Sequence, residues 1–150
     1  MQNDKAISVL NNLIETVKDG EQGFRTAAEG LKDQPTKALF NQYAQQRAQM
    51  ARELQDEVRR LGGDPEKAGS TAGALHRGWI DIKSVVTGKD DHAIVAEAER
   101  GEDVAKNAYD EALKDPLPDS ARTVVQQQAA KVHEAHDRVR NIRDRDKVAH

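Results

Sequence analysis

Residues 4–35 read DKAISVLNNLIETVKDGEQGFRTAAEGLKDQP. Apolar side chains recur every three or four positions in this stretch, which is the spacing of one face of an α-helix. Asn3 or Asp4 can cap the start of the helix, and Pro35 ends it because proline has no N–H for the helical hydrogen-bond ladder. The stretch predicts a helix whose apolar face is interrupted by Glu21. The apolar residues of this face are Ile7, Leu10, Ile14, Val17, Phe24, Ala28 and Leu31.

Three later segments show the same periodicity. The breaks inside the first pair and the second pair of helices are short, so each pair should form an antiparallel hairpin. The connection between the hairpins is long, and it carries a short helical stripe at Leu75, Trp79, Ile82 and Val86. The pattern predicts an all-α fold: a single four-helix-bundle domain over residues 1–150, with two antiparallel αα-hairpins joined by a long crossover that contains a short extra helix. The helices are expected at about residues 4–33, 36–61, 90–114 and 119–145, and the crossover at about 62–90.

The two predicted hairpins are similar to each other when the chain is shifted by 81 positions. This shift aligns Gly20-Glu21 with Gly101-Glu102, and many later positions follow without a gap. The match suggests an internal repeat, a duplicated hairpin, although residue types that are common in helices also produce identities by chance.

One polar residue interrupts the apolar face of each predicted helix at about the same depth. These residues are Glu21, Arg47, Glu102 and Gln128. An ionised carboxylate is costly to bury without a partner. We therefore expect the layer to be a metal site, an ion-pair network or a hydrated cavity.

Two hairpins joined by one long crossover are typical of the ferritin-like version of the four-helix bundle. Glu102 and Tyr109, seven positions apart on one face, resemble the metal-ligand helices of rubrerythrin-type proteins. The motifs DGE at residues 19–21, HRGW at 76–79 and ERGE at 99–102 are similar to those of a bacterial family of ferritin-like four-helix-bundle proteins of unknown function. The resemblance implies a ferritin-like bundle with a structural or protein-interaction role that is associated with stress.

A di-iron centre of that superfamily takes one Glu from each of two helices and a Glu-x-x-His motif from each of the other two. Glu21 and Glu102 match the first half of this ligand set. The second half is missing, because residues 47–50 read RAQM and residues 128–131 read QAAK. A guanidinium and an ammonium can hold inward-facing carboxylates by hydrogen bonds. We expect a degenerate metal site without a cofactor, replaced by a polar core layer of Glu21, Arg47, Glu102, Gln128 and Lys131.

Two alternatives stay open for this layer. In the first, Arg47 and Lys131 extend past the apolar face to solvent, and the glutamates line a wet groove. In the second, Glu21 and Glu102 bind iron or manganese with further ligands, as part of a metal-dependent oxidoreductase or metal-binding protein.

Residues 133–137, HEAHD, are the densest group of possible metal ligands in the sequence. His133 lies off the apolar stripe and no third ligand is evident nearby, so a solvated helix surface is expected there. Glu97 and Glu99 are expected on an exposed acidic face.

The composition excludes several classes of function. Charged residues make up 33% of the chain, the net charge is −3, and acids and bases are interleaved, which argues against nucleic-acid binding. There is no cysteine for disulfides or thiolate chemistry, and no apolar run long enough for a membrane span. We expect a cytoplasmic, non-enzymatic protein that contacts an unknown protein partner or a second copy of itself.

Overall fold

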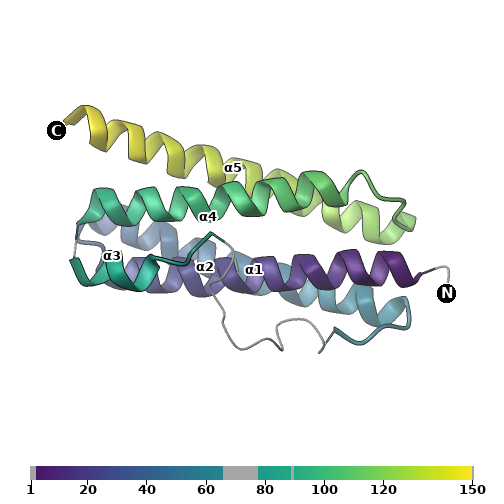
Figure 1. Ribbon diagram of the computed structural model, residues 1–150. Coiled ribbons are helices and arrows are strands. Elements are labelled where there is room, and N and C mark those ends of the chain that lie inside the picture. Colours follow the sequence, from purple (N-terminus) through teal and green to yellow (C-terminus); the bar gives the residue numbers. More distant parts are fainter. Residues whose placement is uncertain (1–2, 66–77, 89, 150) are drawn as a thin grey trace.

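The computed structural model describes residues 3–65, 78–88 and 90–149, and these residues form five α-helices without a strand (Figure 1). The expectation of an all-α fold is confirmed for this part of the chain. Leu75, His76 and Arg77, which the sequence analysis placed in the crossover, lie outside the described residues. The helices are α1 (Asp4–Gly30), α2 (Gln34–Arg60), α3 (Ile82–Gly88), α4 (Asp91–Ala112) and α5 (Asp119–Ala149).

The long helices α1, α2, α4 and α5 lie side by side, and each runs antiparallel to the neighbours that it contacts (Figure 1). α1 packs on α2 and α4 on α5, while α1 also contacts α4 and α2 also contacts α5. The short helix α3 packs against α1 and α4 at the end of the bundle where α4 begins (Figure 1). None of the helices in the described ranges is both long and apolar enough to cross a membrane.

Aspartate side chains fix the ends of the helices. Asp33 caps α2, since its carboxylate accepts hydrogen bonds from the Thr36 backbone N–H at 3.1 Å and from the Thr36 hydroxyl at 2.5 Å. Asp91 in the first turn of α4 accepts hydrogen bonds from the backbone N–H groups of Lys32 and Asp33, both at 2.9 Å. These bonds attach the α1–α2 loop to α4. Asn3, at the start of α1, makes no side-chain cap.

Trp79 fixes the crossover to the bundle, because its indole ring lies between two helix glycines. A Cβ on Gly23 of α1 would lie 2.2 Å from the Trp79 Cδ2 atom, and a Cβ on Gly101 of α4 would lie 2.2 Å from its Cε2 atom. Only glycine leaves room for the ring at these positions, and Trp79 is 2% exposed as a result. Gly78 precedes it with φ +84°, a left-handed conformation that glycine adopts without strain.

The apolar core consists of two clusters, one towards each end of the bundle. Arg47 of α2 and Glu102 of α4 fall between the clusters along their helices, and Gly20 falls between them on α1. A thin polar layer therefore divides the core. The first cluster takes residues 6–17 of α1, 50–58 of α2, 105–112 of α4 and 121–132 of α5, with Leu117 from the loop before α5. The second takes residues 24–28 of α1, 40–44 of α2, 94–98 of α4 and 135–142 of α5, with Leu31, Trp79 and Ile82.

Candidate functional site

The polar layer contains a bidentate ion pair between α2 and α4. Nη1 of Arg47 donates to Oε1 of Glu102 at 2.7 Å, and Nη2 donates to Oε2 at 2.9 Å. Both side chains are 0% exposed. The planar guanidinium thus satisfies both oxygens of the carboxylate, which is the strongest geometry for such a pair.

The surroundings of Arg47 hold its charge in the core. Its guanidinium carbon lies 5.4 Å from the centre of the Phe24 ring, and the glycine at position 20 leaves space for Nη1, which would lie 3.2 Å from a Cβ there. Burial opposes the charged form of Arg47, but the Glu102 carboxylate outweighs this effect and raises the pKa of the guanidinium above its ordinary value. Nε of Arg47 has no hydrogen-bond partner among the described residues, so part of the desolvation cost remains uncompensated.

Gln128 of α5 is fully buried close to this layer and has its own partners. Its amide oxygen accepts a hydrogen bond from the Tyr109 hydroxyl at 2.6 Å, and its amide nitrogen donates to the Met50 carbonyl oxygen at 3.1 Å and to the Glu53 carboxylate at 2.9 Å. Burial raises the pKa of Tyr109 well above its usual value, so the hydroxyl stays protonated and acts as the donor. Gln128 therefore connects α5 to both α4 and α2.

The expected five-residue layer needs two corrections. Glu21 is 25% exposed and pairs with Arg25 at 3.0 Å, one turn further along α1. The residue of α1 that faces Arg47 is Gly20, and neighbouring side chains on a helix point about 100° apart, so Glu21 lies to the side. Lys131 is exposed on α5, because the next residue, Val132, takes the core position.

The groups in this layer do not fit a di-iron centre. Such a centre needs several free carboxylate and imidazole ligands. Both oxygens of Glu102 are bonded to a guanidinium, and the nearby polar groups are the Gln128 amide, the Tyr109 phenol and the half-buried Glu53 carboxylate, which accepts a hydrogen bond from that amide. The layer can hold helices in register, but the residues described there offer no imidazole and no set of carboxylates for a pair of metal ions.

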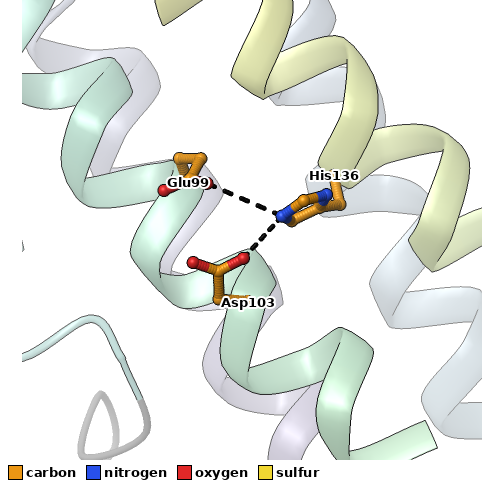
Figure 2. Close-up of side chains that lie close together, drawn as sticks. All are labelled: Glu99, Asp103 and His136. Carbon is orange, nitrogen blue, oxygen red and sulfur yellow. Dashed lines mark hydrogen bonds and ion pairs between the residues drawn. The ribbon is translucent and has the colours of Figure 1, made fainter. Parts of the chain in front are cut away.

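A second polar cluster joins α4 to α5 near the surface (Figure 2). Nε2 of His136 lies 2.5 Å from Oδ1 of Asp103 and 3.6 Å from Oε1 of Glu99. His136 is 2% exposed and Glu99 is 8% exposed, whereas Asp103 is half-exposed. The two carboxylates come from successive turns of α4, and Figure 2 shows both directed towards the imidazole.

Further charged groups orient this cluster from α5. Nδ1 of His136 lies 3.2 Å from Oδ1 of Asp137, and this hydrogen bond lowers the pKa of the Asp137 carboxyl. Nη1 of Arg143 lies 3.1 Å from Oε2 of Glu99, so the other oxygen of Glu99 is the one that faces the imidazole. The imidazole and the Glu99 carboxylate are thus each held by a second group.

The acidic face expected on α4 is wrong for Glu97 and Glu99, which are both buried. Glu97 is 2% exposed because it accepts a hydrogen bond from the Asp81 backbone N–H at 2.7 Å and pairs with Arg100 at 3.0 Å. It therefore helps to attach the crossover. The solvated surface expected around His136 is also wrong, because that part of α5 packs against α4.

His133 illustrates the difference between the two histidines of α5. It pairs with Asp110 of α4 at 2.8 Å, and both side chains are about two-fifths exposed, at 41% and 44%. This pair joins the same two helices as the His136 cluster, but it belongs to no described group of three ligand residues.

A groove of about 390 Å³ lies between α1 and α4. Its described lining is mostly apolar, and it includes the carboxylates of Glu111 and Asp115 but no histidine, lysine or cysteine. The groove therefore lacks the paired base and nucleophile that acyl-transfer chemistry requires. Its lining residues are Val9, Asn12, Leu13, Thr16, Val104, Asn107, Ala108, Glu111, Ala112 and Asp115.

Comparison with known proteins places the chain in a family. None of the curated proteins compared with it matches. The sequence profile of a family described as "Domain of unknown function (DUF2383)" matches residues 5–115, which span α1 to α4 and include both members of the buried ion pair. Because the match covers more than half of the 150 residues, the chain belongs to the DUF2383 family.

Proposed function

We propose that this protein is a non-enzymatic, ferritin-like four-helix bundle that acts through structural or protein–protein contacts, with an ion pair in place of the di-iron centre. Two antiparallel hairpins joined by one long connection support the ferritin-like assignment. The association with stress rests on the sequence resemblance alone.

The observation that carries the proposal is the closed Arg47–Glu102 pair. A guanidinium bonded to both carboxylate oxygens, at 0% exposure, leaves Glu102 no free oxygen for another cation. The positive charge of Arg47 also repels cations from the middle of the bundle, where interactions between charges are screened weakly.

The pair has a structural role that follows from its place between two apolar clusters. If α2 slid by one turn against α4, Arg47 would enter an apolar cluster and both charges would lose their partners. Uncompensated buried charges are strongly destabilising, so the pair penalises every register except the observed one. We therefore assign it to the specificity of the fold, as single buried polar residues fix the register of coiled coils.

The second candidate is a protein that binds iron or manganese through Glu21 and Glu102. The pairing of Glu21 with Arg25 and of Glu102 with Arg47 weighs against it, since both carboxylates are neutralised by arginines. To serve as ligands, they would have to break both pairs.

Metal analysis separates the two candidates. Untagged protein is incubated with Fe²⁺ or Mn²⁺ without oxygen, desalted and analysed for metal, alongside Glu21→Gln and the exposed α1 control Glu29→Gln. We expect equal metal content in all three proteins. We also expect EDTA to change the melting temperature of the wild type and of Glu21→Gln by the same amount. Two ions per chain that disappear in Glu21→Gln but not in Glu29→Gln would overturn the proposal.

A further inference from the structure

We propose that Glu99, Asp103 and His136 bind one divalent transition-metal ion between α4 and α5. This site is separate from the buried ion pair, because its ligands lie where α4 contacts α5 and not in the middle of the bundle. The inference goes beyond the proposed structural role and does not depend on it.

The three ligand atoms are already close enough to share an ion. Nε2 of His136 and one oxygen each of Glu99 and Asp103 lie within 4.8 Å of one another. Metal bonds of about 2.0–2.2 Å place neighbouring ligands of a tetrahedral ion about 3.4 Å apart. The separation of 3.6 Å from Glu99 already matches, and the separation of 2.5 Å from Asp103 needs to widen by about 1 Å as the ion replaces the shared proton.

The orientation of His136 suits a ligand. Asp137 can accept the proton on Nδ1, which leaves Nε2 free to coordinate on the side that faces α4. Arg143 holds the far oxygen of Glu99 and shares its charge with Asp144 at 3.0 Å. A carboxylate on the other ring nitrogen fixes the orientation of a ligating imidazole and raises its basicity, whereas Arg143 orients Glu99 without adding to metal affinity.

Burial gives the site a closed side and an open side. His136 and Glu99 are nearly buried, whereas the side chain of Asp103 is 48% exposed. An ion can therefore reach the ligands from solvent past Asp103 and complete its coordination with water. The protein would hold it by three ligands, which is the number found in open zinc sites.

The ligand types select the class of metal. One imidazole nitrogen with two carboxylates suits Zn²⁺, Co²⁺, Ni²⁺, Mn²⁺ or Fe²⁺, whereas Mg²⁺ and Ca²⁺ prefer oxygen ligands alone. A bound ion would join α4 to α5 and stabilise the second hairpin. We use Zn²⁺ as the probe, with Mg²⁺ and Ca²⁺ as controls.

The test compares Asp103→Asn with Asp110→Asn in untagged full-length protein. Asp103 is half-exposed, so its amide variant should fold, and Glu99→Gln serves as a second variant that keeps the side-chain shape. Asp110 is the matched control, because it also pairs with an α5 histidine but belongs to no group of three possible ligands among the described residues. Thermal melts and zinc titrations are measured for all of these proteins.

We expect Zn²⁺ to bind the wild type at one ion per chain and, at a hundredfold excess over its Kd, to raise the melting temperature by about 5–10 °C. Asp103→Asn and Glu99→Gln should each weaken binding at least tenfold, and Asp110→Asn should leave it unchanged. Imidazole ¹⁵N NMR should show zinc shifting Nε2 of His136 while Nδ1 keeps its proton.

Three results would overturn the site. The first is the absence of a zinc-dependent rise in the wild type. The second is equal stabilisation by Mg²⁺ or Ca²⁺, which would mean a non-selective acidic surface. The third is zinc binding that Asp103→Asn does not weaken, or that Asp110→Asn weakens as much as Asp103→Asn does. Either outcome would mean that zinc binds to scattered surface ligands.

Discussion

Replacing Arg47 by methionine should strongly destabilise the bundle. The substitution keeps an unbranched, flexible side chain, although a shorter one, and it removes both hydrogen bonds to Glu102, which are 2.7 and 2.9 Å long. Glu102 is 0% exposed, so its carboxylate would be left charged in the core without a partner. Breaking a buried pair from one side costs about 3–5 kcal/mol of unfolding free energy. Glu102→Leu should cost a similar amount, because it strands the guanidinium instead.

Removing both charges should restore most of this loss. In Arg47→Met/Glu102→Leu no group in the layer needs desolvation, and the new side chains join the two apolar clusters. Apolar replacement of a buried ion pair is often neutral or stabilising, so the double variant should lie within about 1 kcal/mol of the wild type, or above it. The two substitutions are then strongly non-additive, with a coupling energy of about 6–10 kcal/mol.

Urea denaturation followed by helical circular dichroism at neutral pH measures these free energies, provided that the m-values agree between variants. Arg59→Met is the control, because Arg59 pairs with Asp56 at 3.2 Å on the surface, where the two side chains are 57% and 68% exposed. Such a pair contributes about 0–1 kcal/mol. A loss in Arg47→Met no larger than that in Arg59→Met would refute the reasoning.

Two further predictions concern the crossover and a helix cap. Gly101→Ala should lower the unfolding free energy by about 1–3 kcal/mol, because the new methyl group displaces the Trp79 ring. The fluorescence of Trp79 should shift to longer wavelength at the same time. Gly88→Ala is the control and should lose no stability, because no atom lies within 4 Å of the added Cβ. Asp33→Ala should cost about 1 kcal/mol at neutral pH through the lost cap. Hydrogen bonds from Thr36 lower the pKa of Asp33 below its ordinary value of 3.8. The cap therefore contributes its full stability above pH 3.8, and this contribution is lost as the pH falls through the pKa of Asp33 in the folded state. The unfolding free energies of wild type and Asp33→Ala, measured by urea melts, should converge in acid.

Much of the fold can be predicted from the spacing of apolar residues. The long helices and their order follow from a period of 3–4 residues and from the prolines between segments. The short helix α3 holds only Ile82 and Val86 of the predicted stripe, because Trp79 precedes it and packs against the helix glycines instead. Arg47, Glu102 and Gln128 could be found in the same way, because a polar residue inside an apolar stripe is conspicuous. Their partners could not, since spacing along one helix does not reveal which residue of another helix lies opposite.

Glycine explains why Glu21 was misplaced. A glycine adds nothing to an apolar stripe, so the pattern on α1 skips Gly20 and assigns the layer to the next residue. The structure shows that the small residue is the one that matters, because Arg47 fills the space beside it. The same applies to Gly23 and Gly101, whose missing side chains form the slot for Trp79.

The carboxylate–histidine cluster escaped prediction for a different reason. Glu99 and Asp103 are four residues apart and visibly share a face of α4, but His136 lies 33 residues beyond Asp103. Only the packing of α4 against α5 brings them together, and charged residues beside a helix contact look like solvated surface in a sequence. The signal available was the surplus of acids on α4 facing a histidine-rich turn of α5.

The measurement that tests the central claim most directly is ¹⁵N NMR of the arginine side chains at neutral pH. A guanidinium held by two hydrogen bonds in a closed core should give resolved Nη–H signals for Arg47 that exchange slowly with water, and these signals should disappear in Glu102→Leu. If Arg47 instead exchanges as fast as the exposed Arg59, the layer is open to solvent and the ion pair does not hold the bundle together.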